Sequence, residues 1–434
     1  MKIVHLSTFV NGGAGKAAFR LHLSLLEQGV ESHFISLFDY PKEIENFNDV
    51  NFHCFIDYKP TIKNKLKNLK IRLNKYKTRN SLKKNLELLD SLKPSINAET
   101  TSTPFSNYII ENHPLIKEAD VIHLHWVSQM VDYSTFFKFL KKPVIWTLHD
   151  MNPFQGLFHY TEDYLRNKDL FYLTEIDKIF VKFKRGEIQK LGEPYLKIVA
   201  PSKWLQKEAS KSDVFSNYKI ELIPNCINSN SFKTLEKAEA RKHLNLPESK
   251  FIILFIAESI NNRRKGFDFI LEVLKKFEPD KSPLFLVIGD KVKSIPNSEN
   301  CILFGRIESD EKLNKFLSAA DVFILPSRED NLPNVLLESF ASGTPIIGFP
   351  IGGLTEHLIE KQTGLIADEI NSSSLFNAIN KFMEQRQNYS PMTIKKYAIE
   401  NFSHSTNAKK YICLYKEILS QTKSKTILKE KIHD

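Results

Sequence analysis

Residues 321–349 read "DVFILPSREDNLPNVLLESFASGTPIIGF" and show a strand–helix–strand pattern. The two outer runs, "DVFILPS" and "TPIIGF", are short and apolar, as the buried strands of a parallel sheet are. Between them, Pro333 suits the first turn of a helix and Gly343 suits its end. We therefore expect two parallel strands joined by a helix that covers one face of their sheet.

The same alternation of apolar runs and helical patterns extends along the whole chain. Strand-like runs include "KIVHLS", "DVIHLHW" and "PVIWTLH" in the first half, and "KIELIPN", "FIILFIA" and "LFLVIGD" in the second. A chain of 434 residues is too long for one ordinary core. The sequence therefore predicts an α/β fold of two doubly wound, Rossmann-like domains that face one another across a cleft. Their expected bounds are residues 1–198 and 199–400, followed by a C-terminal segment, 401–434.

The composition is that of a folded protein, with 42% hydrophobic and 26% charged residues. The four cysteines are scattered without metal-ligand spacing, which favours a reducing compartment. The first residues contain too short an apolar run for a signal peptide, and no stretch of about 18 apolar residues could span a bilayer. We therefore expect a cytoplasmic protein.

A basic helix is expected at about residues 59–92. Residues 59–84 carry eleven Lys or Arg and no acid, within a net charge of 61 − 51 = +10. Apolar residues recur along this segment at steps of four and three, and they are Ile62, Leu66, Leu69, Leu73 and Tyr76. Such a helix suits an anionic membrane surface, and it equally suits a helix docked on its own domain with a solvated basic face. Nucleic acid is not an expected partner, because no recognised binding module accompanies the charge.

Residues 7–23, "STFVNGGAGKAAFRLHL", form a glycine-rich turn between a strand and a helix. A Walker-type phosphate loop is excluded, because Val10 and Ala17 stand where it needs a glycine and a hydroxyl. A dinucleotide fingerprint, G-x-G-x-x-A, begins at Gly13, and Asp39 lies beyond it as a candidate ribose ligand. A helix N-terminus also attracts other anions, including the diphosphate of a nucleotide sugar. The turn alone does not separate these two interpretations from a tight turn that binds nothing.

Two further strand ends of the first half carry polar side chains. His123, His125 and Trp126 stand at or just past the end of one strand, and His149 and Asp150 at the end of the next. Residues two apart in a strand share a face, so His123 and His125 can point the same way. No third ligand stands at a recognisable spacing, and we expect no metal ion. Ligands of open α/β sheets bind beyond the carboxyl ends of strands, which makes these residues site candidates.

The second half places three cations, Arg263, Arg264 and Lys265, after a buried strand and at the start of a helix. Cations beside helix N–H groups form a favourable cradle for a diphosphate. Asp330 and Glu338 stand eight positions apart, one in the loop before a helix and the other inside it. A carboxylate buried on such a helix needs partners, and two vicinal ribose hydroxyls would supply them.

The stretches "GGAGKAA", "HLHW", "WTLHDM", "RRKGF" and "PSREDNLPNVLLESFASGTPII" resemble the retaining, nucleotide-sugar-dependent glycosyltransferases of the GT-B fold. The specific resemblance is to glycosyl transferase group 1, family 4, in its branch that builds bacterial exopolysaccharide or lipopolysaccharide. It runs along nearly the whole chain, and "FSHSTNAKKYICLYKEIL" resembles the family's last helix, which crosses back to the first domain. The resemblance implies an acceptor-binding first domain and a nucleotide-sugar-binding second domain.

The resemblance also implies roles for single residues of the second domain. Glu338 would hold the ribose hydroxyls of the donor, and Asp330, where the family has Glu, would face the donor sugar. The backbone N–H groups near Asn331 and Leu332 would serve the sugar or the phosphate. Arg306 lies where the family has its base-contacting loop.

Lys265 matches the lysine that binds the donor diphosphate in the resembled family. The family's arginine five positions earlier is Ile260 here, so Arg264 or Arg263 would take its place. No metal ion and no cofactor are implied, because protein cations would hold the diphosphate.

In the first domain, His125 matches the histidine that lies near the reacting sugar carbon, and His149 and Asp150 would lie on the acceptor side. The glycines that match the family's loop beside the donor phosphates are Gly12, Gly13 and Gly15.

The implied activity is transfer of a sugar from a UDP- or GDP-sugar to a saccharide or lipid-linked saccharide, with retention of configuration, in bacterial cell-surface polysaccharide biosynthesis. With the basic helix, a lipid-linked acceptor would place the enzyme at the inner face of the membrane. Two alternatives stay open. One is an NAD-dependent oxidoreductase, supported by the fingerprint at Gly13 and by Asp39. The other is a non-catalytic sugar-binding partner, supported by the departures at Asp330 and Ile260.

Overall fold

The computed structural model describes residues 1–42, 44, 46–192, 194–228, 231–290, 300–307 and 309–433, except for the side chains of residues 63, 65, 279 and 426–433. The chain divides into two compact units. The first comprises Met1–Ile223 and Asn407–Asp434, and the second comprises Pro224–Thr406.

The first unit is built on a seven-stranded parallel sheet. Side by side, its strands are β3 (Phe52–Cys54), β2 (Glu31–Ser36), β1 (Lys2–Ser7), β4 (Val121–Leu124), β5 (Val144–Thr147), β6 (Leu196–Ala200) and β7 (Ile220–Leu222). Its helices are α1 (Gly13–Glu27), α2 (Ile62–Ser81), α3 (Lys83–Leu92), α4 (Pro114–Glu118), α5 (Tyr133–Phe139), α6 (Thr161–Arg166), α7 (Phe171–Ile188), α8 (Lys203–Lys211) and most of α15 (His404–His433). The central strands β4 and β5 are wholly buried, which explains why their sequences are continuous apolar runs.

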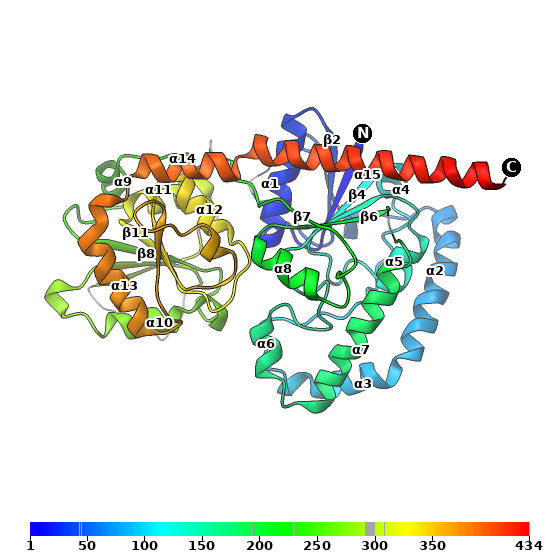
Figure 1. Cartoon of the computed structure of the whole chain (residues 1–434), viewed down its shortest axis with the longest axis horizontal. Coiled ribbons are helices and arrows are strands. Elements are labelled where there is room, and N and C mark those ends of the chain that lie inside the picture. The colour runs from blue at the N-terminus through cyan, green and yellow to red at the C-terminus, as the bar shows by residue number, and fades with distance from the viewer. Residues whose placement is uncertain are drawn as a thin grey trace. The chain divides into compact units, whose positions relative to one another are not determined.

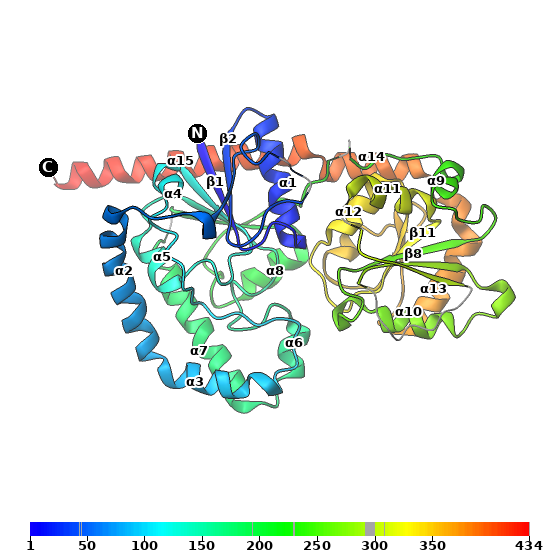
Figure 2. The ribbon, with the colours of Figure 1, turned by 180° about the vertical axis from the view of Figure 1, so that it is seen from behind.

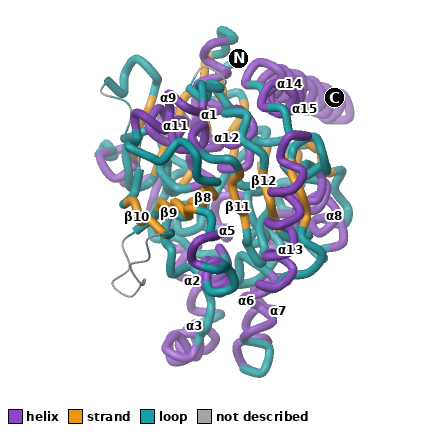
Figure 3. The backbone as a smooth tube through the Cα atoms, turned by 90° about the vertical axis from the view of Figure 1, so that its left-hand side faces the viewer, coloured by secondary structure: helices purple, strands orange, loops and turns teal. Residues whose placement is uncertain are grey.

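The second unit is built on a six-stranded parallel sheet. Its strands lie in the order β10 (Cys301–Phe304), β9 (Leu284–Ile288), β8 (Ile252–Ile256), β11 (Val322–Leu325), β12 (Ile346–Gly348) and β13 (Gly364–Ile366), and Figure 3 shows the first five side by side. Its helices are α9 (Lys237–His243), α10 (Phe267–Leu274), α11 (Asp310–Ala319), α12 (Asn334–Ala341), α13 (Ser372–Gln385) and α14 (Pro391–Phe402). Figure 1 shows α9, α11 and α12 on one face of this sheet and α10 and α13 on the other. The predicted α/β class, with doubly wound sheets, is confirmed.

Segment 321–349 adopts the predicted strand–helix–strand structure. β11 and β12 pair in parallel, with Phe323 opposite Ile346, and α12 connects them. Pro333 is the residue before α12 rather than its first residue. Gly343 follows the helix with φ of +81°, a left-handed conformation that glycine adopts without strain.

The first unit extends beyond the expected boundary after residue 198. The run "KIELIPN" contains β7, which pairs with β6 in the first sheet, with Ile198 opposite Ile220. Apolar pattern alone identifies a strand here but does not tell which sheet it joins. At the other end, Tyr411 and Tyr415 of α15 belong to the first unit, where the Tyr415 hydroxyl lies 2.7 Å from His123 Nδ1.

α2 lies at the outer edge of the first unit and leads into α3 (Figure 1, Figure 2). Its apolar stripe faces solvent, with exposed fractions from 53% to 79% for Ile62, Leu66, Leu69, Leu73 and Tyr76. The opposite face is buried against the unit through Asn68, Ile71 and Lys75. α2 therefore does dock on its own domain, but through this opposite face, and the apolar stripe takes no part in the docking. Across the part of the chain that the structure describes, no helix combines the length and apolarity needed to cross a membrane.

Candidate functional site

The second unit places the predicted diphosphate cations after strand β8, against the end of the neighbouring strand β11. After β8, residues Arg263–Lys265 form a 3₁₀ turn, in which Asn262 Oδ1 accepts a hydrogen bond from the Arg264 backbone N–H at 3.0 Å. Gly266 follows with φ of +73°, and a Cβ there would lie 1.9 Å from the carbonyl oxygen of Pro326, which follows β11. Only glycine permits this approach, which fixes the turn against the adjacent strand end.

Asp330 is the acidic partner of these cations. Its Oδ2 accepts hydrogen bonds from Lys265 Nζ at 2.6 Å and from Arg264 Nη1 at 3.2 Å, and its Oδ1 accepts one from the Asn331 N–H at 3.1 Å. Burial acts to raise the pKa of Asp330, but Lys265 and Arg264 outweigh it and hold the pKa below the ordinary 3.8. The carboxylate is therefore ionised at neutral pH.

The two candidates for the family's arginine differ in their surroundings. Ile260, at the position of that arginine, is 4% exposed and packs in the hydrophobic core of the second unit. Arg264 is buried, donates to the Glu329 carbonyl oxygen at 3.0 Å and shares Asp330 with Lys265. Arg263 is exposed. The geometry therefore favours Arg264 as the replacement.

Glu338 lies on the second turn of α12 and is only 2% exposed. The loop before this helix is held on both sides. The Asn331 carbonyl oxygen accepts a hydrogen bond from the Gly353 N–H at 2.8 Å, and the Leu332 carbonyl oxygen accepts one from Asn225 Nδ2 at 3.1 Å. The loop at Asn331 and Leu332, which is expected to serve the donor, is therefore fixed by the protein. It connects the two carboxylates, Asp330 and Glu338.

Arg306 follows β10 at the same edge of the sheet as the Arg263–Lys265 turn. Its Nη2 lies 2.7 Å from Oε1 of Glu258, which follows β8, and both side chains are exposed. The structure thus places Arg306 on the surface, in contact with the segment that leads from β8 to the cationic turn.

Asp39 supports the glycine-rich turn of the first unit. Its carboxylate accepts hydrogen bonds from the backbone N–H groups of Val10 at 2.8 Å and Asn11 at 3.1 Å. Asp39 was the residue that favoured a dinucleotide site, where it would bind ribose. Its use inside the turn counts against the oxidoreductase alternative.

The three glycines of this turn differ in their surroundings. A Cβ at Gly15 would lie 2.2 Å from the Phe9 carbonyl oxygen, so the fold itself requires glycine there. At Gly12 and Gly13 a Cβ would meet nothing within 4 Å. These two residues precede and open α1, where the helix N–H groups attract anions. Gly12 and Gly13 therefore leave room for a ligand at the helix N-terminus.

His125 is the middle member of a chain of three histidines. Its Nε2 lies 2.9 Å from His5 Nδ1, and its Nδ1 lies 3.1 Å from His149 Nε2. Burial lowers the pKa values of His5 and His125 well below the ordinary 6.5, and that of His149 to about 4. All three rings are therefore neutral at pH 7, and His125 offers hydrogen bonds rather than a charge.

Asp150, the residue after His149, is a buried hydrogen-bond acceptor. Its Oδ2 accepts hydrogen bonds from Trp126 Nε1 at 2.7 Å and from His159 Nδ1 at 2.6 Å, and its Oδ1 accepts one from the Asn152 N–H at 3.0 Å. Burial acts to raise the pKa of Asp150, but His159 and the other donors outweigh it. Asp150 thereby orients Trp126 and His159.

Sequence reasoning did not single out His5 or His159. His5 lies in β1 directly opposite His123 of β4, a pairing that only the strand order reveals. The signal available in the sequence was a histidine inside the apolar run "KIVHLS".

His5, His123 and His125 form the one group among the described residues that could hold a metal ion, with ligand atoms within 4.8 Å of one another. Five of their six ring nitrogens already have partners, however, and His5 Nε2 is the one without a hydrogen bond to any described residue. His123 Nδ1 and Nε2 lie 2.7 Å from the Tyr415 hydroxyl and 2.8 Å from Thr147 Oγ1. A metal would have to break several of these contacts, so the cluster fits a hydrogen-bonded core better than a metal centre.

The known proteins that are similar to this chain include one solved structure and two curated relatives. HepE of Anabaena, solved in complex with UDP, matches with a TM-score of 0.62 and 13% identity over 96% of this chain and 100% of that chain. An uncharacterized 41.2 kDa protein in the cps region of Klebsiella pneumoniae is 24% identical over 305 residues, 68% of this chain and 78% of that protein. Lipopolysaccharide 1,2-N-acetylglucosaminetransferase of Salmonella typhimurium is 24% identical over 230 residues, 47% of this chain and 59% of that protein.

The fold is the two-domain α/β fold called GT-B, which this chain shares with solved glycosyltransferase structures. Residues 236–401, most of the second unit, match the model of the family described as Glycosyl transferases group 1. The matched span contains Lys265, Asp330 and Glu338, whereas the Gly12–Gly15 turn and His125 lie outside it.

Proposed function

We propose that the protein transfers a sugar from a UDP- or GDP-sugar to a saccharide or lipid-linked saccharide, with retention of configuration, in bacterial cell-surface polysaccharide biosynthesis. The observation that carries the proposal is the convergence of Lys265 and Arg264 on Asp330 at the carboxyl edge of the second sheet. The names of the relatives, a cps-region protein and a lipopolysaccharide transferase, support the kind of pathway. The UDP complex of HepE supports a uridine nucleotide as donor.

In the proposed reaction the bond between the anomeric carbon and the diphosphate oxygen breaks, and its electron pair stays on the diphosphate. The acceptor hydroxyl oxygen bonds to the anomeric carbon on the same face, and its proton passes to the leaving phosphate. Negative charge builds on the diphosphate, so preorganised cations lower the barrier most there. Lys265 and Arg264 are proposed to supply that charge in place of a metal ion.

The remaining roles follow the chemistry of each group. Glu338 is proposed to accept hydrogen bonds from the ribose hydroxyls and Asp330 to contact the donor sugar. The helix start at Gly12–Gly13 is proposed to bind phosphate. His125, neutral and held by its neighbours, is proposed to position or polarise the substrate at the reacting carbon rather than to act as a charged acid.

We also propose that the enzyme works at an anionic membrane surface through α2. At about 100° per residue, Lys70 and Lys77 lie on one flank of the exposed apolar stripe and Arg72 lies on the other. A helix of this kind lies in the plane of the interface, with its apolar side chains at the acyl boundary and its cations at anionic headgroups. A lipid-linked acceptor would be presented at the same surface.

Turnover tests the proposal. The purified protein, incubated with UDP- and GDP-sugars and a saccharide acceptor, is expected to release nucleoside diphosphate in the presence of EDTA. Proton NMR of the product gives its anomeric configuration, which should match that of the donor. Failure to turn over or bind any nucleotide sugar, together with binding of NAD, would overturn the proposal in favour of the oxidoreductase.

A further inference from the structure

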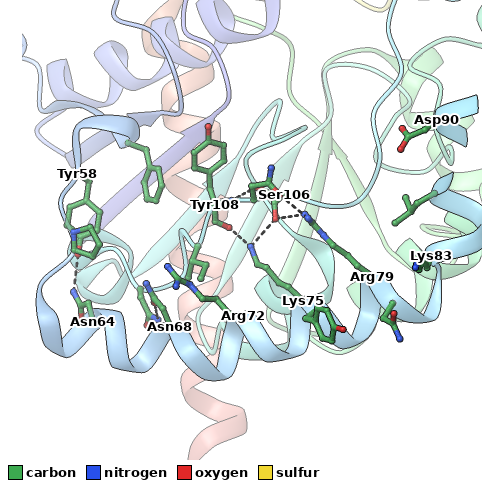
Figure 4. A pocket seen from close by; sticks show the side chains of 18 of the residues that line it. Tyr58, Asn64, Asn68, Arg72, Lys75, Arg79, Lys83, Asp90, Ser106 and Tyr108 are labelled. Carbon is green, nitrogen blue, oxygen red and sulfur yellow. Dashed lines mark hydrogen bonds between the residues drawn. The ribbon is translucent and has the colours of Figure 1, made fainter. Parts of the chain in front are cut away.

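The first unit contains a pocket of about 710 Å³ to which the proposed reaction gives no role. The pocket lies between the inner face of α2, helix α3 and the loop of residues 106–112 (Figure 4). Its volume falls within the range of small-molecule sites, roughly 300–1,000 Å³.

The pocket is lined by polar and cationic side chains. Four cations and two carboxylates line it, so these side chains carry a net charge of 4 − 2 = +2. They are Arg72, Lys75, Arg79, Lys83, Glu87 and Asp90. Several asparagine amides add donors and acceptors to the same wall. Cations beside amides suit a ligand that has both a phosphate and hydroxyl groups.

Two of the cations form the rigid back of the pocket. Lys75 is buried and its ammonium group donates to the carbonyl oxygens of Ser106, at 3.2 Å, and Tyr108. Arg79 donates from Nη2 to the same Ser106 oxygen at 2.8 Å and from Nη1 to Asn107 Oδ1 at 2.9 Å, and Figure 4 shows Lys75 and Arg79 converging on this loop. Their charges are thus already committed to the protein.

Arg72 differs from these two cations. It lines the pocket from α2, and within the described part of the chain its guanidinium group has no hydrogen-bond or ion-pair partner. A planar guanidinium is well suited to a phosphate, which it can bind through two parallel hydrogen bonds. Arg72 is therefore the group best placed to bind an anionic ligand in this pocket.

The pocket opens beside the apolar stripe of α2. Tyr76 lines the pocket and is also a member of that stripe, where it is exposed. The two faces of one helix therefore border the bilayer proposed above and a polar pocket next to it.

We infer that this pocket binds a phosphate ester that carries hydroxyl groups, as the headgroup of an anionic membrane lipid does. The phosphate meets Arg72, and the hydroxyls meet the amides of the wall. This inference rests on the membrane surface included in the proposed function. Phosphatidylglycerol and free glycerol phosphate share this chemistry.

Vesicle binding with matched headgroups tests the inference. Phosphatidylcholine vesicles with equal fractions of phosphatidylglycerol or phosphatidylserine have the same charge but differ in headgroup hydroxyls. The full-length protein is expected to bind the phosphatidylglycerol vesicles about tenfold more tightly, the size of one or two neutral hydrogen bonds between headgroup hydroxyls and the amides of the wall. Arg72→Gln removes the group that holds the phosphate in the pocket, so the hydroxyls no longer reach the amides and the two affinities should come within about twofold.

Lys77→Gln is the matched control, because it removes one charge from the same helix outside the pocket. It should weaken binding to both kinds of vesicle and keep the preference. Equal binding of the wild type to both vesicles, or loss of the preference in Lys77→Gln as well, would overturn the inference. Free glycerol phosphate, added as a competitor, shows in which form the ligand binds. If it abolishes the preference for phosphatidylglycerol vesicles, the pocket binds the headgroup alone. If the preference persists, the pocket binds the headgroup only when a bilayer presents it.

Nucleotide binding separates this inference from the proposed function. Arg72 lies outside the second unit, so Arg72→Gln should keep the wild-type thermal shift with UDP or GDP. If the wild type shows no such shift but the headgroup preference depends on Arg72, the proposed transfer reaction fails and the lipid site stands.

Discussion

The carboxylate of Asp330 lies 2.6 Å from the ammonium group of Lys265, and the pair joins the loops after β11 and β8. Arg264 contacts the same carboxylate oxygen at 3.2 Å. The residue proposed to contact the donor sugar therefore also orients the cations proposed to hold the diphosphate. This shared contact makes the cationic turn the part of the site most sensitive to substitution.

Lys265→Ala is expected to lower kcat/KM for the nucleotide sugar at least about a hundredfold, because removal of one preorganised donor to a developing negative charge costs roughly that much. Steady-state release of nucleoside diphosphate measures the effect. Lys275→Ala is the control, since Lys275 is exposed at the other end of α10. A loss of less than about threefold in Lys265→Ala would show that the diphosphate binds elsewhere.

The glycines of the first turn should separate a structural role from a binding role. Gly15→Ala places a Cβ 2.2 Å from the Phe9 carbonyl oxygen, so it should lower Tm and cost about 1–3 kcal/mol of stability. Gly13→Ala meets no protein atom within 4 Å, so it should keep Tm but weaken nucleotide-sugar binding if a phosphate approaches there. Differential scanning fluorimetry and calorimetric titration test both. Unchanged binding in Gly13→Ala would remove the turn from the donor site.

Mild acid should destabilise the first unit through its buried histidines. His22 is fully buried, with Nδ1 2.7 Å from Ser32 Oγ, and burial lowers its pKa from 6.5 to about 4. Between these values the unfolded chain binds a proton that the folded chain does not, so the stability is complete above pH 6.5 and is lost as the pH falls toward 4. At pH 5 this residue alone should account for a loss of about 2 kcal/mol relative to pH 7.5.

Urea unfolding at the two pH values measures this loss. The three tryptophans, Trp126, Trp146 and Trp204, all lie in the first unit, so their fluorescence reports on it. His22→Gln should show a loss of stability smaller by about 2 kcal/mol than the wild type does. An equal loss in both proteins would mean that His22 stays as easily protonated in the folded state as in the unfolded state.

The exposed stripe of α2 should control membrane binding. Replacing Leu66, Leu69 and Leu73 together with Gln should weaken binding to anionic vesicles at least about a hundredfold, because each buried leucine contributes roughly 1.5–3 kcal/mol. Circular dichroism should show unchanged helix content, since these side chains do not pack in the unit. Phe171→Gln with Tyr172→Gln, two exposed aromatics on α7, is the control and should bind as the wild type does. Equal weakening in the control would point to general surface hydrophobicity.

Local patterns predicted much of the fold and the second-unit site. Strand, loop and helix are consecutive at residues 321–349, so Asp330 and Glu338 could be assigned to a loop and a helix from spacing alone. The turn Arg263–Lys265 was found for the same reason. The contact of this turn with Asp330 depends on the pairing of β8 with β11. The sequence indicated this contact only through the general rule that ligands bind beyond the carboxyl ends of the strands, where both loops lie.

Features that depend on long-range packing were not predictable in this way. The period of α2 predicts an apolar stripe but not whether the stripe faces the unit or solvent. The contact between His5 and His125 depends on the neighbouring positions of β1 and β4. Asp39 stood at a spacing that suits ribose binding, yet the backbone of its own turn uses its carboxylate. Strand order, or competition between hydrogen-bond partners, decides each of these outcomes. Neither can be read from a single sequence.

The most direct test of the account is a thermal-shift measurement with UDP, GDP, ADP, CMP and NAD on the wild type and on Glu338→Ala, with Glu384→Ala, an exposed carboxylate of α13, as control. A nucleotide at a hundred times its dissociation constant should stabilise the fold by about 2.7 kcal/mol. The account predicts that UDP or GDP stabilises the wild type and Glu384→Ala but not Glu338→Ala. A shift with NAD alone, or a UDP or GDP shift that survives in Glu338→Ala, would contradict it.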